Sequence, residues 1–407
     1  GDIFDCLTTH PYPAFTPWSA VDRITGIKNL FHATAESRFY ADLSNKPCVA
    51  EELGTLAPVV AGEKTAAAYI RNTLFNLWTH DCEGLMWWCG FDQLNLNFPP
   101  YQWCAVEREL GLFRADGSVK PVGEALKEFR KFIRSLPFDS LPTFRKDAVC
   151  VLSEGQDTWK NAWGAWVLAK QAGYDIRFHH CSETLPEADL YLVPGLAGML
   201  NLPKRCFEQL TAAVEAGATA YFSLDNAMLA PFQEFFGLSP QYREQFEGSS
   251  TTTFANEEFT YTFHSRLTFD PERAETLASD DDGRALFTRA DYGKGEVFFL
   301  GFPLESMLIG ENRKIEENFW KFYQRIAQRK LAERLLLSGD PSVSLTEHVF
   351  PDGSIVICAI NNAESPVQTC FKWHPDAYEI ELLHGDSELI EAHQITIFRL
   401  KKTAVNS

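Results

Sequence analysis

The first 140 residues alternate between strand-like and helix-like segments, and this alternation limits the folds available to the chain. Three short apolar segments are each followed by a longer segment with helical periodicity. Because parallel neighbouring strands need long crossover connections, the pattern predicts three consecutive parallel βα units. A closed (β/α)₈ barrel needs about 250 residues, so this region supplies only about three of the eight units. The predicted strands are 3–9, 47–50 and 84–91, and the predicted helices are 20–43, 62–79 and 122–135.

The remaining residues divide into two further regions. From about 148 to 331, continuous apolar runs alternate with helix-like segments, which is typical of a parallel sheet covered on both faces. From about 342 the apolar period changes to two, and Asp352-Gly353 between two alternating runs predicts a hairpin. We therefore expect an α/β chain with three domains. They are the C-terminal part of a (β/α)₈ TIM barrel in 1–140, a flavodoxin-like parallel α/β domain in 146–335 and a small antiparallel β-sandwich domain in 340–403.

Three βα units without the rest of a barrel would leave sheet edges and apolar helix faces in water. We therefore expect that a missing N-terminal barrel segment, either in the same polypeptide or in another chain, completes the structure. This segment is a predicted partner of the chain.

The charge and the cysteine content restrict the partners and the compartment. A net charge of −18 argues against nucleic acid or an anionic membrane as a partner. No apolar run approaches the length of a membrane span and no signal peptide is apparent, so we expect a cytoplasmic location. The ten cysteines are dispersed without a CxxC pair, which is typical of reduced cysteines that act as small hydrophobic residues.

A metal site is not expected from the sequence. The run His179-His180-Cys181 is too compact to form a closed tetrahedral zinc site on its own. We therefore predict neither a metal nor an organic cofactor.

Polar and aromatic residues follow the three predicted strands of the first region. Since the carboxyl ends of parallel strands meet at one edge of a sheet, we expect these residues to form a common site. A carboxylate at such a strand end is both rigid and accessible, which suits a nucleophile or an acid. Each residue alone has a structural explanation, because a histidine beside proline is often a turn residue and paired tryptophans often lie in a core. The residues are His10 and Tyr12, then Glu51 and Glu52, then Trp87 and Trp88.

This order of residues resembles the last three strands of the clan A glycoside hydrolases, which are (β/α)₈ enzymes that cleave β-glycosidic bonds with retention. The resemblance implies that Glu52, two residues before Gly54, is the nucleophile, with Glu51 as the alternative. It implies that His10 and Tyr12 hydrogen-bond the nucleophile and line the sugar site. It also implies that one of Trp87 and Trp88 stacks under the sugar, without deciding which.

The predicted order of domains is similar to that of family forty-two β-galactosidases and related β-mannosidases. In those proteins the middle domain packs subunits into a trimer, so the resemblance implies a homo-oligomer. It also implies a β-glycoside, oligosaccharide or polysaccharide substrate.

The resemblance leaves the second carboxyl of a retaining mechanism unassigned. Such enzymes need two carboxyl groups about 5–5.5 Å apart. In the clan the acid/base follows an asparagine on the fourth strand, but the only Asn-Glu pair here, Asn256-Glu257, lies in the middle region. We expect the acid/base in the missing part of the barrel. Glu83, Asp92 and Glu107 are the weaker candidates within the chain.

Two other functions are consistent with the sequence. One alternative is a non-catalytic carbohydrate-binding or assembly protein that is derived from a glycosidase. Alternatively, an unrelated α/β enzyme would act through the middle region, with Ser153, Glu154 or Asp157 after its first strand. Polar residues in such a loop are more often helix caps than catalytic groups.

Overall fold

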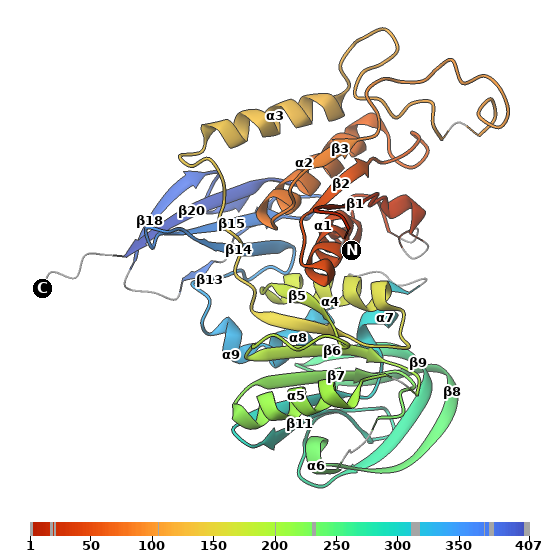
Figure 1. Ribbon diagram of the computed structural model, residues 1–407, viewed down its shortest axis with the longest axis vertical. Helices are drawn as coiled ribbons and strands as arrows, with labels where there is room; N and C mark the ends of the chain where they lie inside the picture. Colours follow the sequence, from red (N-terminus) through yellow and green to blue (C-terminus); the bar gives the residue numbers. More distant parts are fainter. Residues whose placement is uncertain are drawn as a thin grey trace, which may run out of the picture. The chain divides into compact units, whose positions relative to one another are not determined.

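The computed structural model describes residues 3–16, 19, 22–104, 106–199, 201–229, 233–310, 318–369, 371–373 and 378–402 (Figure 1). The chain forms two compact units, one from residues 1–145 with 334–407 and the other from residues 146–333. Both units combine helices with sheets, and parallel and antiparallel sheets are both present, as the mixed α/β class requires. The finer division into three domains stays a prediction.

The first unit begins with a three-stranded parallel sheet in the order β1-β2-β3. In its register, Leu7 lies opposite Cys48 and Thr9 opposite Ala50. The predicted βα units are therefore present, although the first helix begins later than predicted, after Gly26 in an extended conformation. The elements are β1 (Leu7–Thr9), α1 (Ile27–Ser44), β2 (Cys48–Leu53), α2 (Glu63–Thr79), β3 (Leu85–Trp87) and α3 (Pro121–Ser135).

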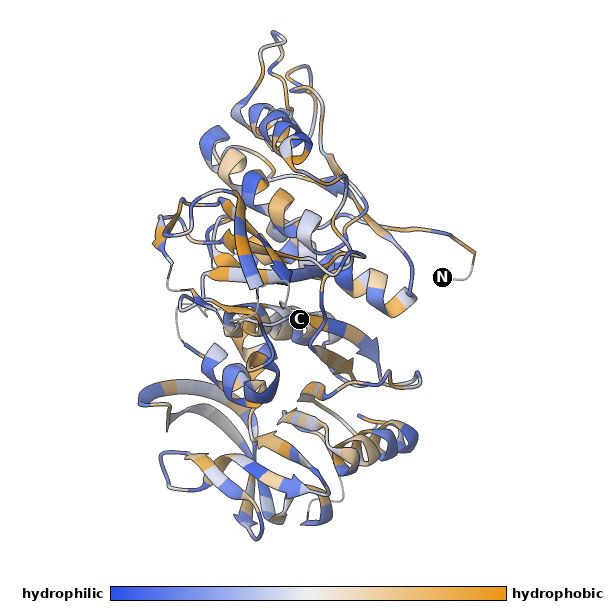
Figure 2. Cartoon of the chain, turned by 90° about the vertical axis from the view of Figure 1, so that its left-hand side faces the viewer, coloured by the Kyte–Doolittle hydropathy of each residue, from blue (hydrophilic) through white to orange (hydrophobic). Residues whose placement is uncertain are grey.

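Among the helices of this sheet, α3 has the clearest division into an apolar and a polar face, and hydrophilic and hydrophobic residues both lie along the helices in Figure 2. On one side, Ala50 and Leu53 of β2 pack with Leu30 of α1 and Ile70 of α2 in a buried cluster. This packing holds the strands against the helices and so determines where the strand ends lie.

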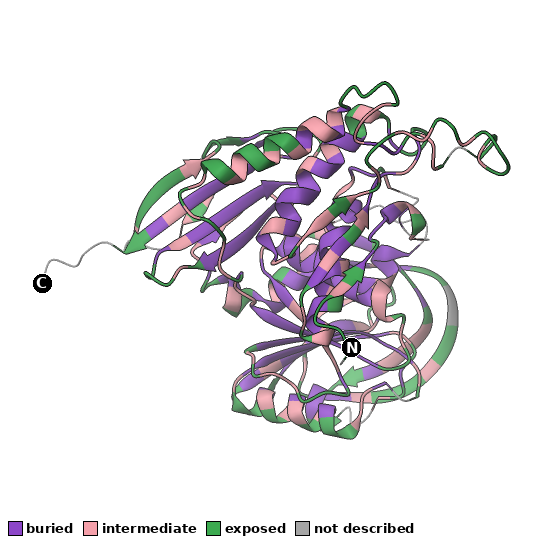
Figure 3. Ribbon diagram, turned by 45° about the horizontal axis from the view of Figure 1, so that its top comes forward, coloured by how far each residue is buried: buried purple, intermediate pink, exposed green. Residues whose placement is uncertain are grey.

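A four-stranded antiparallel sheet, ordered β14-β15-β20-β18, belongs to the same unit. Its hairpin forms at Asp352-Gly353 as predicted, with the Asp352 carboxylate accepting from the Ser354 amide at 2.9 Å. Figure 3 shows that β15 and β20 are largely buried. The strands are β14 (Val343–Val349), β15 (Ile355–Asn361), β18 (Tyr378–His384) and β20 (Ile395–Lys402).

This sheet covers helix faces that the sequence left exposed. Val356 and Ile397 pack in one cluster with Phe75 of α2 and with Phe129 and Phe132 of α3. The expectation that all the apolar helix faces of the barrel-like region lie in water is therefore wrong for α2 and α3. The reason is that the C-terminal sheet supplies the missing apolar surface.

The second unit contains a seven-stranded sheet in the order β10-β11-β12-β7-β6-β4-β5. The five strands from β12 to β5 are parallel, and β4 lies between β5 and β6, so the direction of chain progression reverses at β4. Ligands in such sheets bind beyond the carboxyl ends of the strands near this reversal. The parallel strands are β4 (Ala148–Leu152), β5 (Ile176–His180), β6 (Leu190–Leu196), β7 (Thr219–Leu224) and β12 (Gly295–Leu300).

The other elements of this unit include a long hairpin that the sequence analysis missed. Strands β8 and β9 pair with each other along most of their length. Two short helices, α8 and α9, end the unit, and residues 311–317 before them lie outside the described part of the chain. The elements are α4 (Thr158–Ala172), α5 (Lys204–Ala216), β8 (Leu238–Phe254), β9 (Glu257–Pro271), β10 (Glu275–Ser279), β11 (Ala285–Tyr292), α7 (Leu304–Ile309), α8 (Trp320–Ile326) and α9 (Gln328–Leu331).

None of the helices in the described ranges has both the length and the apolar character needed to cross a membrane.

Candidate active site

The Glu52 carboxylate is held by two side chains that follow the neighbouring strand β1. The Nδ1 atom of His10 lies 2.9 Å from Glu52 Oε2. The Tyr12 hydroxyl donates to the other oxygen, Oε1, at 3.1 Å. Each carboxylate oxygen therefore has its own partner, and the structure brings together three of the six residues expected at these strand ends, namely His10, Tyr12 and Glu52.

Tyr12 acts here as a hydrogen-bond donor. Its side chain is buried, and burial raises the pKa of the phenol well above its usual range. The negative charge of Glu52 and the hydrogen bond to it raise the pKa further, because both disfavour a phenolate. The hydroxyl is therefore protonated at neutral pH, and it orients the Glu52 carboxylate by donating a hydrogen bond to it.

Glu51 lies at the edge of the same site. The pairing of β2 with β3 is irregular between Ala50 and Leu53, and both of these residues are buried in the core. Strict alternation, which would send Glu51 and Glu52 to opposite faces, therefore does not hold here. Glu51 Oε2 lies 3.8 Å from His10 Nε2, and the Glu51 side chain is 45% exposed, against 24% for Glu52. Glu52 is the more firmly held of the two carboxylates.

Gly54 lies two residues after Glu52, at a position where a side chain would be crowded. A Cβ atom at this position would lie 3.1 Å from Tyr12 Cε1 and 3.1 Å from the Trp88 carbonyl oxygen. Both contacts are tighter than an ordinary van der Waals approach. The absence of a side chain therefore lets the Tyr12 ring and the end of β3 approach β2 closely.

The two tryptophans have different surroundings. Trp87 packs against the buried cluster that contains Leu53 and donates its indole N–H to the Leu110 carbonyl at 2.9 Å. Trp88 is 41% exposed, and its backbone N–H donates to the Leu53 carbonyl at 2.8 Å. Trp87 is thus largely a packing residue, whereas Trp88 offers an accessible ring beside the Glu52 strand end. The Trp88–Cys89 peptide bond is cis.

Glu107 joins this group from the loop after β3. Its carboxylate accepts the indole N–H of Trp88 at 3.2 Å, and its charge also raises the pKa of Tyr12. The sequence analysis named Glu107 only as a weak candidate acid, because a loop position carries no strand-end signal. The structure therefore adds a second carboxylate, besides Glu52, to the surroundings of Tyr12.

The other two candidate acids are placed differently. Asp92 forms a buried ion pair with Lys120 at 2.6 Å and accepts the Gly111 amide at 2.9 Å, so it fixes the loop that follows β3. Glu83 precedes β3 in the chain, at the amino end of this strand. Neither residue contacts Glu52 in the hydrogen bonds and ion pairs of the described residues.

Polar side chains of α1 form hydrogen bonds with residues at and after the end of β1. The Thr9 hydroxyl donates to Glu36, and Thr16 Oγ1 lies 2.8 Å from His32 Nε2. Burial lowers the pKa of His32 to about 3 and raises the pKa of Glu36. His32 is therefore neutral at physiological pH and serves as a buried hydrogen-bonding group near the start of the His10–Tyr12 segment.

The residues proposed for a rival site in the second unit have structural partners. The Asp157 carboxylate accepts the Lys160 amide at 3.1 Å and so caps α4. The Ser153 hydroxyl is buried and accepts a hydrogen bond from the Gln156 side chain. Glu154 is exposed and lies near His180. These contacts favour the cap interpretation for Asp157.

Comparison with known proteins relates the chain to others through its fold. No protein-family model matches the sequence, and no curated protein is significantly similar to it. A catalytic mutant of a GH42 β-galactosidase from G. stearothermophilus matches with a TM-score of 0.69 and 11% identity over 98% of this chain and 60% of that chain. The chain shares the fold of GH42 β-galactosidases.

Two further solved structures agree with this finding. The β-galactosidase from the psychrophilic Marinomonas ef1 matches with a TM-score of 0.69 and 14% identity, over 98% of this chain and 61% of that chain. The exo-β-1,4-mannosidase Op5Man5 from Opitutaceae bacterium strain TAV5 matches with a TM-score of 0.61 and 20% identity, over 79% of this chain and 60% of that chain. The chain thus spans about 60% of the length of these proteins. The resemblance in architecture inferred from the sequence is confirmed, and identities this low show the fold alone.

Proposed function

We propose that the chain is the C-terminal part of a retaining glycoside hydrolase that cleaves β-glycosidic bonds, with Glu52 as its nucleophile. The observation that supports this most is the position of the Glu52 carboxylate at the carboxyl end of β2, between the Tyr12 hydroxyl and the His10 ring. The chain that carries this arrangement also shares its fold with β-galactosidases.

The proposed reaction begins with attack of a Glu52 oxygen on the anomeric carbon. A bond forms between that oxygen and the sugar, while the bond to the leaving oxygen breaks and the leaving oxygen takes a proton from a second carboxyl group. The second group, now a carboxylate, then takes a proton from water, whose oxygen attacks the anomeric carbon as the bond to the Glu52 oxygen breaks. Tyr12 and His10 hold the carboxylate in one orientation, which lowers the entropy cost of reaching the transition state.

Trp88 is the proposed platform for the sugar. Its ring is accessible, whereas Trp87 packs into the core. The apolar face of a sugar ring stacks well on an aromatic ring, and the polar edge of the sugar remains free for hydrogen bonds. Glu107 accepts the Trp88 indole N–H at 3.2 Å and so fixes the orientation of the ring.

The acid/base would come from a further barrel segment. Within the described residues, no strand pairs with the outer edge of β1 or of β3. A segment that adds parallel strands to this sheet would complete the barrel and bring a second carboxyl group towards Glu52. The predicted homo-oligomer and the cytoplasmic location stay predictions from the sequence.

A pair of matched variants tests the proposal. Hydrolysis of aryl β-galactosides and β-mannosides is measured with the full gene product, or with this chain and the completing segment together. Glu52→Gln is expected to lower kcat by about 10⁴-fold, because the nucleophile is lost. Glu51→Gln, one residue away, is expected to keep activity within about tenfold. Equal activity in the wild type and Glu52→Gln would overturn the assignment.

A further inference from the structure

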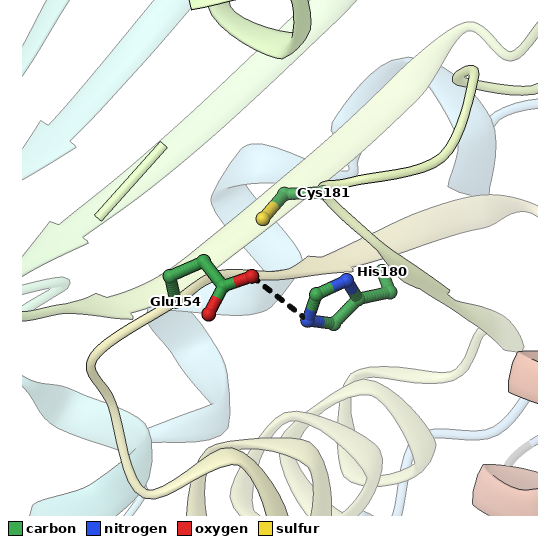
Figure 4. Close-up of side chains that lie close together, drawn as sticks. All are labelled: Glu154, His180 and Cys181. Atoms are coloured by element: carbon green, nitrogen blue, oxygen red, sulfur yellow. Dashed lines mark ion pairs between the residues drawn. The ribbon is translucent and has the colours of Figure 1, made fainter. Parts of the chain in front are cut away.

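Three side chains with metal-binding atoms meet in the second unit, away from the proposed glycosidase site. They are Glu154, His180 and Cys181, and Figure 4 shows their side-chain ends facing one another. A carboxylate oxygen, a ring nitrogen and the sulfur all lie within 4.8 Å of one another. Glu154 Oε1 lies 3.9 Å from His180 Nε2.

The fold positions these residues rigidly. Leu152, the last residue of β4, lies opposite His180, the last residue of β5, and the Cys181 amide donates to the Leu152 carbonyl at 2.9 Å. Glu154 follows β4 by two residues, and its amide donates to the Asn201 carbonyl at 3.0 Å. The cluster therefore lies at the carboxyl ends of adjacent parallel strands, where ligands of doubly wound sheets bind.

The burial of the three residues suits a site that is open on one side. Cys181 is 2% exposed, whereas the side chains of Glu154 and His180 are 53% and 32% exposed. The sulfur is therefore on the buried side of the site, and the Glu154 and His180 side chains are on the side that faces solvent. Zinc sites with three protein ligands keep a fourth position for water or another small ligand in the same way.

Ser182 contacts the imidazole ring of His180. The Ser182 hydroxyl lies 2.7 Å from His180 Nδ1. The Ser182 backbone N–H donates to the same Nδ1 atom at 3.3 Å, so Ser182 holds the ring with Nε2 on the side of Glu154. Metal-binding histidines commonly have such an outer partner.

An ordinary structural explanation does not account for the whole cluster. An exposed Glu–His pair at 3.9 Å contributes little to stability, since such surface pairs are weak. A buried cysteine alone would be a packing residue, yet this sulfur faces a carboxylate. A divalent cation would bind both groups, with the thiol releasing its proton on binding.

We propose that Glu154, His180 and Cys181 form a binding site for a divalent metal ion, with Zn²⁺ as the best match. A set of one sulfur, one nitrogen and one oxygen ligand suits zinc, whose bond lengths to these atoms are about 2.0–2.3 Å. The exposed Glu154 and His180 side chains have room to close around the ion. The sequence did not reveal the site because Glu154 is far from His180 and Cys181 along the chain.

The test uses the purified chain after treatment with a chelator. Binding of Zn²⁺ is measured by competition with a chromophoric chelator, and Co²⁺ binding is followed by absorption. We expect one equivalent of metal and a thiolate-to-cobalt charge-transfer band. Glu154→Gln and His180→Gln are expected to weaken binding at least about tenfold, and Cys181→Ser is expected to abolish the band.

Two controls keep the test decisive. His179→Gln changes the neighbouring histidine, and Cys206→Ser changes another buried cysteine of the same unit, so both should leave affinity and spectrum unchanged. Because Glu154 is exposed, its variant should fold even where Cys181→Ser does not. The proposal is overturned by the absence of saturable binding, by unchanged affinity in both Glu154→Gln and His180→Gln, or by a cobalt spectrum without a thiolate band.

Discussion

Each unit contains a glutamate that accepts a hydrogen bond from tyrosine, and the two glutamates differ in their access to solvent. Glu52 accepts from Tyr12 at 3.1 Å, and its side chain is 24% exposed. Glu305, in the second unit, is completely buried and accepts from Tyr221 at 2.9 Å, Tyr323 at 2.7 Å and Ser223 at 2.6 Å. A hydrogen-bonded carboxylate is therefore not by itself a sign of catalysis.

Burial separates the roles of the two glutamates. The three hydroxyl donors of Glu305 satisfy a carboxylate that no substrate reaches, so the group stabilises the packing of α7 against the sheet. Glu52 has two partners and remains accessible at the end of a strand. The comparison therefore predicts that changes at Glu305 affect stability, whereas changes around Glu52 affect reactivity.

Removal of the Glu305 carboxylate should have the largest effect on stability. Glu305→Ala leaves three buried hydroxyl groups without their acceptor, so the free energy of unfolding should fall by about 3–5 kcal/mol. Glu305→Gln keeps an acceptor oxygen and should cost clearly less. Urea unfolding of both variants measures the difference. Equal, small losses in both variants would show that the hydroxyl network contributes little.

Removal of the Tyr12 hydroxyl should affect the reaction. Tyr12→Phe takes away one of the two partners of Glu52, and we expect kcat/KM to fall by about 10–100-fold with little change in the urea midpoint. Tyr242→Phe, at an exposed tyrosine of the other unit, is the matched control. If Tyr12→Phe lowers stability and leaves kcat/KM unchanged, then Tyr12 resembles the tyrosines around Glu305.

A smaller effect is expected at Gly54. Gly54→Ala places a methyl group 3.1 Å from the Tyr12 ring and from the Trp88 carbonyl, so these groups must shift by a few tenths of an ångström. We expect about a tenfold loss of kcat/KM, because the hydrogen bond to Glu52 lengthens. Gly62→Ala is the control, since nothing lies within 4 Å of a Cβ atom there. Equal activity in the two variants would contradict the close-approach explanation.

The pH dependence of stability gives the smallest expected signal. Burial raises the pKa of Glu305 above its usual value in the folded state. The folded protein then binds a proton that the unfolded chain has lost, so the stabilisation by this group is present at low pH and declines as pH rises through the raised pKa. The stability of the wild type relative to Glu305→Gln should therefore decrease with rising pH. A difference that is constant with pH would contradict the raised pKa.

The sequence predicted which residues contact Glu52, but it did not predict the irregular strand pairing beside it. The meeting of His10, Tyr12 and Glu52 follows from parallel strands whose carboxyl ends share an edge, which short-range pattern reveals. The irregular pairing beside Glu51 was not predictable, since it depends on how β2 and β3 match in three dimensions. Glu107 was predicted only as a weaker candidate acid, because its loop has no regular period.

Longer-range packing was also beyond the sequence pattern. The apolar faces of α2 and α3 were recognisable, but not the sheet that covers them, because residues such as Phe132 and Ile397 are distant in the chain. In the second unit, the strand pattern predicted the parallel sheet. The approach of Glu154 to His180 arises only when β4 and β5 pair, so neither segment indicates it alone.

Covalent labelling with a 2-fluoro glycoside tests the central claim most directly. Such a sugar with a dinitrophenyl leaving group needs no acid for departure, so it reports on the nucleophile. We predict that peptide mapping of the labelled protein places the sugar on Glu52, that Glu52→Gln is not labelled and that Glu51→Gln is labelled. A sugar attached to Glu51, to Glu107 or to a residue of the second unit would contradict the assignment of Glu52.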